Sequence, residues 1–226
     1  MQRSKRYKAN QGLLEKNKVY PVKDAYNLLK KSTPVKFDES VEAHFHLNIN
    51  PEKSEQQVRS GAELPHGTGK SVKIAVFTED AGKLAAAQKA GAEITGGEEL
   101  IEKIRTAGTL VADVTVATPD MMPKLTKIAK ILGPKGLMPN PKDGTVTEDM
   151  ENTISKLKKG KVNFKSDKSG NIHVPIGKLS FNTEKISENY EVLKKTLEKA
   201  KPAGVKGKFI KSATLSSTMG LGVRIA

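Results

Sequence analysis

The chain has 226 residues, 39 of them basic and 25 acidic, which gives a formal net charge of +14 and a pI near 9.7. It contains no cysteine, which excludes disulfides and thiolate chemistry, and no apolar run long enough to span a membrane. The charge favours a polyanionic partner such as nucleic acid, and a basic start with no apolar run after it favours a cytoplasmic protein.

The first part of the chain predicts a helix and then a strand. Residues 21–31 begin with proline, which suits the first turn of a helix, and place apolar residues on one face. Residues 41–49 alternate strictly, with Glu42, His44 and His46 on the polar side. Two histidines at this spacing could chelate zinc, but no third ligand is assigned nearby. We therefore interpret this side as a polar surface that touches water or RNA.

The middle of the chain alternates strands with helices. Strands are predicted at 72–77, 92–94 and 114–117, and helices at 83–89, 98–105 and 121–132. Alternation of this kind is typical of βαβ units around a parallel sheet, so we expect a Rossmann-like three-layer α/β domain. Glycine-containing turns mark both ends of this part, and we expect a hinge formed by Gly67, Gly69, Lys159 and Gly160.

The last part of the chain predicts a hairpin, a long helix and a strand. Residues 162–165 and 172–174 flank a turn in which Gly170 supplies a positive φ. Residues 183–200 form an amphipathic helix, and residues 209–215 a strand that is followed by a polar turn over 216–220.

The charge is spread unevenly over these parts. Residues 1–67 carry 12 basic and 8 acidic residues, residues 68–159 carry 14 and 12, and residues 160–226 carry 13 and 5. The two ends together hold +12 and the middle only +2. We therefore expect an α/β protein of two domains, in which 1–67 and 160–226 form one basic α+β domain and 68–159 form the insert.

Two glycine-rich segments are candidates for phosphate binding. The 67–71 segment, Gly-Thr-Gly-Lys-Ser, resembles the end of a P-loop, but Leu64 stands where the first glycine should be, and a strand follows instead of a helix. The 133–144 loop holds three prolines and three glycines. It either presents amides and lysines to phosphate or packs Leu137 and Met138 under the sheet. We therefore expect a protein without catalytic residues, metal or cofactor. The alternative to this non-enzymatic function is a nucleotide-dependent enzyme that uses the inserted domain.

Motifs in order along the whole chain resemble the bacterial large-subunit ribosomal protein L1 family. They occupy residues 6–8, 36–42, 64–70, 133–144, 167–173 and 217–220. The resemblance implies that the basic domain binds the stalk region of 23S rRNA in the large ribosomal subunit. It also implies assistance in releasing deacylated tRNA from the exit site, and repression of translation through the leader of the protein's own mRNA.

Matched motif by motif, the resemblance implies an RNA surface of Lys36, Phe37, Glu42, Lys165, Lys168, Ser212, Thr218, Met219 and Gly220. Lysines would neutralise phosphates, Phe37 would stack or pack against sugars, and the 218–220 turn would fit an RNA groove. Family members usually have proline where this chain has Leu221, so we expect a less rigid turn. A DNA-binding protein is disfavoured because the chain shows no helix-turn-helix or zinc signature.

Overall fold

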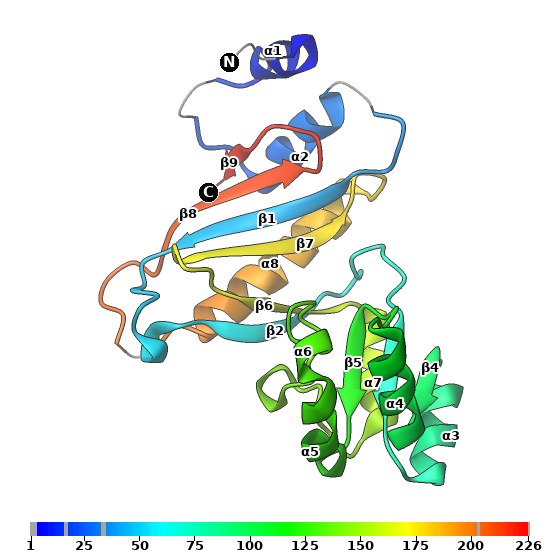
Figure 1. Ribbon diagram of the computed structural model, residues 1–226. Helices are drawn as coiled ribbons and strands as arrows, with labels where there is room; N and C mark the ends of the chain where they lie inside the picture. Colours follow the sequence, from blue (N-terminus) through cyan, green and yellow to red (C-terminus); the bar gives the residue numbers. More distant parts are fainter. Residues whose placement is uncertain (1–3, 16–17, 33–34, 203, 226) are drawn as a thin grey trace. The chain divides into compact units, whose positions relative to one another are not determined.

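The computed structural model describes residues 4–15, 18–32, 35–202 and 204–225. The chain forms two compact units, one made of Met1–Gly69 and Gly160–Ala226 and the other of Lys70–Lys159 (Figure 1). The sequence prediction placed the boundaries after residues 67 and 159, and the units divide after Gly69 and Lys159. Both units combine helices with sheets, which confirms the mixed α/β class. None of the helices in the described ranges is long and apolar enough to cross a membrane.

The first unit is built on a four-stranded antiparallel sheet with the order β7-β1-β8-β9. Its strands are β1 (Ser40–Leu47), β7 (Asn171–Lys178), β8 (Ile210–Ser217) and β9 (Val223–Ile225). β1 is central and pairs with β7 on one edge and β8 on the other. Its residues alternate between half-buried and buried, as the sequence predicts for a strand with one packed face.

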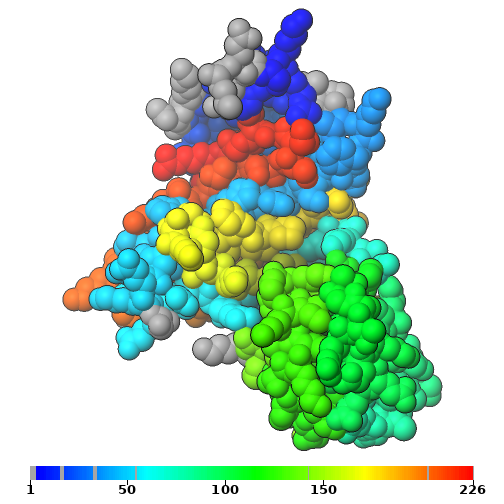
Figure 2. Space-filling view, viewed as in Figure 1, coloured from blue at the N-terminus to red at the C-terminus, as the bar shows by residue number. Residues whose placement is uncertain are grey.

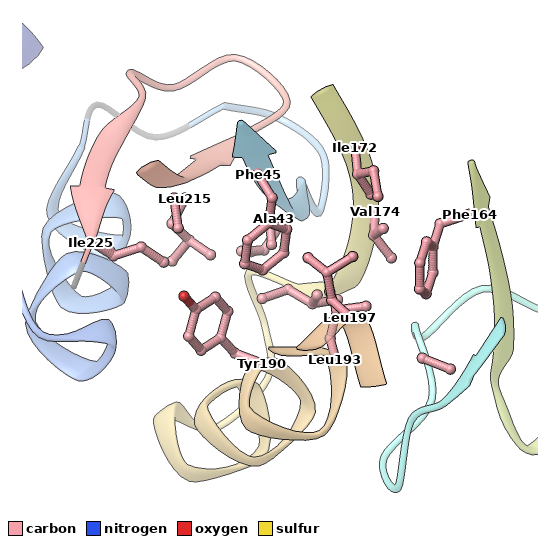
Figure 3. Packing of buried hydrophobic residues seen from close by; sticks show 14 of the residues in the cluster. Ala43, Phe45, Phe164, Ile172, Val174, Tyr190, Leu193, Leu197, Leu215 and Ile225 are labelled. Atoms are coloured by element: carbon pink, nitrogen blue, oxygen red, sulfur yellow. The ribbon is translucent and has the colours of Figure 1, made fainter. Parts of the chain in front are cut away.

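Two helices pack against the buried face of this sheet, α2 (Val22–Lys31) and α8 (Thr183–Lys199). Figure 3 shows the contact, in which Leu193 and Leu197 of α8 lie beside Ala43 and Phe45 of β1. The Phe45 and Tyr190 rings stack with centroids 5.7 Å apart. Both helices were predicted by their apolar faces. A short helix near the start, α1 (Lys5–Gln11), is capped by Ser4 and was not predicted.

The prediction that residues 162–165 and 172–174 pair as a hairpin is wrong. The first of its strands, β6 (Lys161–Lys165), pairs instead with β2 (Arg59–Glu63) in a separate two-stranded sheet. Just before the turn, the Ser166 N–H donates to the Val58 carbonyl, and the Ser166 hydroxyl accepts from the Val58 N–H. β2 therefore satisfies the backbone groups of β6 up to the turn, and β7 pairs with β1 alone.

The second unit has a parallel three-stranded sheet with the order β4-β3-β5. Its strands are β3 (Ile74–Phe77), β4 (Ile94–Gly96) and β5 (Val114–Ala117). Apolar clusters lie on both faces: α4 (Glu98–Ala107) contributes to one, and α3 (Ala81–Lys89) and α7 (Met150–Lys159) contribute to the other. β3 is buried at every position because each face is covered.

Two expectations for this unit need correction, and one of its helices was not expected. The strand at 92–94 begins at Ile94, because the Ala92 N–H is used by the Ala87 carbonyl at the end of α3. α7 was not predicted. The helix at 121–132 is broken into α5 (Met122–Leu125) and α6 (Ala129–Leu132) around a 3₁₀ turn over Thr126–Ile128. The Thr126 hydroxyl donates to the Pro123 carbonyl at 2.5 Å. This bond competes with the backbone hydrogen bonds of a regular helix.

The proline-rich 133–144 segment packs as a connector. Leu137 is buried in the cluster beside α4, and Met138 packs against the same cluster. The Thr115 hydroxyl of β5 donates to the Leu137 carbonyl, which fixes the segment to the sheet. These contacts confirm the packing alternative for Leu137 and Met138.

Candidate nucleic-acid interface

The start of β1 and the end of β8 are joined by reciprocal hydrogen bonds. The Thr218 N–H donates to the Ser40 carbonyl at 3.1 Å, and the Ser40 N–H donates to Thr218 Oγ1 at 3.0 Å. The Thr218 hydroxyl, expected to face RNA, therefore holds two chain segments together. Figure 2 shows the surfaces of these segments side by side, with the C-terminal segment in red and the residues near 40 in light blue.

A buried carboxylate fixes the turn that follows Thr218. Glu39 is only 2% exposed, and its Oε2 accepts the Met219 N–H at 3.1 Å. On the other side of the same segment, the Asp38 carboxylate accepts from the Ser180 N–H at 3.1 Å and from the Ser180 hydroxyl at 2.8 Å. These bonds position Met219 relative to residues 38–40.

The turn and the segment before β1 both present apolar side chains to solvent. Phe37 is 53% exposed and Met219 is 48% exposed, and Lys36 beside Phe37 is also exposed. Large exposed apolar groups next to a cation are suited to sugars and base faces. We call Lys36, Phe37, Thr218, Met219 and Gly220 the Met219 corner.

The polar turn expected over residues 216–220 begins later. Ser216 and Ser217 are the last residues of β8, and only 218–220 lie in the turn. Ser217 is buried, and its hydroxyl has no hydrogen-bond partner within the described ranges. A Cβ on Gly220 would overlap Ser217 Oγ, so the close packing of this turn requires glycine.

The polar side of β1 forms a hydrogen-bonded surface. His44 bonds through Nδ1 to His173 Nδ1 and through Nε2 to Ser216 Oγ, each at 2.8 Å, and His46 Nδ1 lies 2.8 Å from Asn171 Oδ1. Burial, with a smaller effect of His173, lowers the pKa of His44. Glu42 lies on the same side, with Oε2 3.9 Å from His44 Nε2. Within the described residues, no three possible metal ligands converge.

The remaining predicted contact residues lie away from the Met219 corner. Ser212 pairs with His46 near the far end of β1, and Lys168 lies in the turn before β7. β1 has eight residues, so the two ends of this surface are about 25 Å apart. Lys165 is exposed on β6, in the smaller sheet. The predicted residues thus fall into two groups, the Met219 corner and the residues near the far end of β1. The polar side of β1 extends between these two groups.

The turn that carries Lys168 is organised by Asp167. Its Oδ1 accepts the N–H groups of Ser169 at 2.8 Å and Asn171 at 2.7 Å, and Gly170 has a φ of 77°. The Gly170 carbonyl accepts the Leu47 N–H at 2.9 Å, which ties the turn to the end of β1. The predicted turn and the positive φ of Gly170 are confirmed.

We expect this turn to loosen in acid. The Asn171 N–H, followed by that of Ser169, lowers the pKa of Asp167 below its ordinary value of 3.8. The charged form therefore stabilises the turn above that value, and the stabilisation is lost as the pH falls through the lowered pKa. Amide exchange at Ser169 and Asn171 should accelerate over this range. In an Asp167→Asn variant, amide exchange at these two residues should not show this added acceleration. Equal acceleration in the wild-type protein and the variant would contradict the role assigned to the Asp167 carboxylate.

The predicted hinge residues lie where the chain passes between the two units. Gly67, Gly69 and Gly160 have φ values of 63°, 71° and 111°, and Lys159 ends α7. The fully buried Asn189 of α8 donates to the Gly67 carbonyl at 2.9 Å and to the Ile176 carbonyl at 2.8 Å. One crossing is therefore anchored on the first unit by a buried amide.

Sequence reasoning missed the residues that hold the interface in shape. Glu39, Asp38 and Asn189 have local patterns that indicate loop or helix-surface polar groups, and nothing near them signals burial. Asp38 and Glu39 lie within the 36–42 motif that carries the family resemblance, and this motif is a signal that could have drawn attention to two of them.

Comparisons with known proteins show the family of this chain. The model of the ribosomal protein L1p/L10e family matches residues 29–221. The chain is 50% identical to large ribosomal subunit protein uL1 of Mycoplasma capricolum subsp. capricolum over 222 residues, 98% of this chain and 97% of the relative. Proteins of the same name from Fervidobacterium nodosum and Thermosipho africanus are 49% identical over 222 residues, 98% of this chain and 94% and 95% of the relatives.

A basic unit that presents an open polar sheet, together with these matches, defines a ribosomal protein and not an enzyme. The nucleotide-dependent enzyme is therefore set aside as an alternative. The chain belongs to the ribosomal protein L1p/L10e family.

Proposed function

We propose that this protein is part of the large ribosomal subunit and that its first unit binds the stalk region of 23S rRNA. The observation that carries the proposal is the Met219 corner, where the buried Glu39 carboxylate and the Ser40–Thr218 hydrogen bonds tie the turn to the segment that follows Phe37, and both Phe37 and Met219 are exposed. The unit on which it lies has a net charge of +12. The relatives, named as large-subunit proteins, support the assignment.

The chemistry of the surface divides into two parts. Lys36, Lys165 and Lys168 would neutralise phosphates and provide the salt-dependent part of the affinity. The exposed Phe37 and Met219 side chains, with the close backbone approach at Gly220, would fit sugar edges and the shallow RNA groove. Glu42 and Ser212 would hydrogen-bond base amino groups or 2′-hydroxyls along the polar face.

Two further roles are included in the proposal. The same surface would bind a similar structure in the leader of the protein's own mRNA and repress its translation. On the ribosome, the Rossmann-like second unit would help deacylated tRNA leave the exit site, moving about a hinge at Gly67, Gly69, Lys159 and Gly160. A net charge of only +2 on residues 68–159 supports a role for this unit other than tight RNA binding.

The test is a titration of the full chain with a stalk rRNA fragment at several salt concentrations. Random duplex RNA and duplex DNA serve as competitors. We expect the stalk fragment to bind at least a hundredfold more tightly than either competitor. Equal affinity for all three would overturn the proposal, and preference for duplex DNA would favour a DNA-binding protein.

The Lys168→Ala variant should lose affinity for the stalk fragment mainly at low salt. Lys168 is exposed and would act as a phosphate contact, so its removal should reduce the slope of log affinity against log salt by about one. Lys185→Ala, on α8 and outside the proposed surface, is the matched control. A loss from Lys168→Ala that stays constant as salt rises would contradict a phosphate contact.

A further inference from the structure

A pocket of about 360 Å³ opens in the first unit, between α8, the start of β8 and β9. Its apolar part includes Val19, Phe209 and Ile225. Its volume lies in the range of sites for small molecules. The β8–β9 pairing runs from Ala213↔Ile225 to Leu215↔Val223, and the pocket lies beside the start of β8.

The pocket carries an excess of positive charge. Its lining includes four basic residues, Lys194, Lys208, Lys211 and Arg224, and a single acidic one, Glu198. In the part of the chain that the structure describes, none of these four cations forms an ion pair. Like charges gathered around a concave, partly apolar surface attract anions strongly.

A second, independent feature is the hydroxyl of Tyr190. Tyr190 is 2% exposed and lines the pocket, yet among the described residues its hydroxyl has no hydrogen-bond partner. Figure 3 shows its oxygen directed away from α8, toward Ile225. Buried hydroxyls are nearly always bonded, and leaving one unpaired is costly. The hydroxyl of Tyr26, which is also buried, donates to the Phe181 carbonyl at 2.7 Å, and the Leu179 and Lys178 carbonyls lie 3.1 and 3.3 Å away.

The hydroxyl is available as a donor at neutral pH. Burial, with a smaller effect of Glu198, raises the pKa of Tyr190 to about 12, so the group keeps its proton. A neutral hydroxyl beside several cations is suited to a ligand oxygen that carries negative charge.

We propose that this pocket binds a small phosphorylated ligand. The phosphate of the ligand would contact the basic residues and accept a hydrogen bond from the Tyr190 hydroxyl. The uncharged part of the ligand would pack against Phe209 and Ile225. The site goes beyond the proposed RNA surface, with which it shares only Ser212: it lies at the start of β8, whereas the Met219 corner follows the end of β8.

The first test is calorimetry of the full chain at low salt with inorganic phosphate, AMP and adenosine as probes. AMP should bind saturably and more tightly than phosphate, and adenosine should bind at least tenfold more weakly than AMP. Replacing Lys208 and Lys211 together by glutamine should weaken AMP binding at least tenfold, whereas Lys185→Gln should not. Absence of saturable AMP binding, or an equal loss in the Lys185→Gln control, would overturn the proposal.

The second test isolates the hydroxyl. Tyr190→Phe should weaken AMP binding about tenfold and leave the free protein as stable as before or more so, because an unpaired group is removed. Tyr26→Phe is the control: it should destabilise the protein and leave AMP affinity unchanged. Unchanged AMP affinity in Tyr190→Phe would overturn the proposal, as would one-to-one displacement of AMP by the stalk fragment, which would make the pocket part of the RNA surface.

Discussion

Gly160→Ala should lower the free energy of unfolding of the first unit by about 3–5 kcal/mol. Gly160 has a φ of 111°, which is strained for any residue with a Cβ. A Cβ there would also overlap the Gly67 Cα and lie 3.2 Å from the Gly67 nitrogen. These neighbours are backbone atoms of the other crossing segment, so no side-chain rotation relieves the overlap. The strain and the steric cost therefore add.

Tyrosine fluorescence during urea unfolding measures the free energy of unfolding of the first unit. The chain has four tyrosines and no tryptophan, and Tyr7, Tyr20, Tyr26 and Tyr190 all belong to the first unit. Gly207→Ala is the matched control, because Gly207 has a φ of 77° but no atom within 4 Å of an added Cβ. It should cost only about 1–2 kcal/mol. Equal losses in the two variants would show that the close approach of Gly160 to Gly67 does not exist in solution.

Local sequence patterns predicted the helices and strands whose buried residues recur at the regular spacing of a helix or a strand. The alternation of 41–49 and the apolar faces of 21–31 and 183–200 were sufficient for β1, α2 and α8. β2 was missed because Arg-Ser-Gly-Ala-Glu contains no strong strand former. Without β2, the natural partner of β6 was the next strand in sequence. The pairing of segments about 100 residues apart is a property of the tertiary structure, and the local sequence does not contain it.

The same limit applies to the interface. Phe37 and Met219 were identified through a family resemblance, and their exposure is compatible with the expected role. The burial of Glu39 depends on two strand ends that meet only in the folded unit, so a sequence pattern reads it as a surface carboxylate. Thr218 was assigned to RNA, and the structure shows that its hydroxyl first serves the protein by accepting the Ser40 N–H.

Gly220→Ala should lower affinity for the stalk fragment at least about fivefold, because it displaces the turn that presents Met219. Gly220 does not have a positive φ, so its backbone conformation is open to alanine. The obstacle is packing, since a Cβ would overlap Ser217 Oγ. Ser217 is 4% exposed and enclosed, so relief requires either its hydroxyl or the turn to move. Overpacking of this kind costs about 1–3 kcal/mol, which corresponds to roughly fivefold to 150-fold in affinity.

Ser217→Ala should rescue the Gly220→Ala variant. Without the hydroxyl, the nearest remaining atom to the new Cβ is Ser217 Cβ at 3.4 Å, an ordinary contact. Ser217→Ala alone should be neutral or stabilising, because the hydroxyl it removes has no partner in the described chain. A double-mutant cycle on RNA affinity measures the coupling, with Gly204→Ala as a glycine control elsewhere in the first unit. If the double variant bound RNA as weakly as Gly220→Ala, the glycine would be required by the RNA itself and not by the packing of the turn.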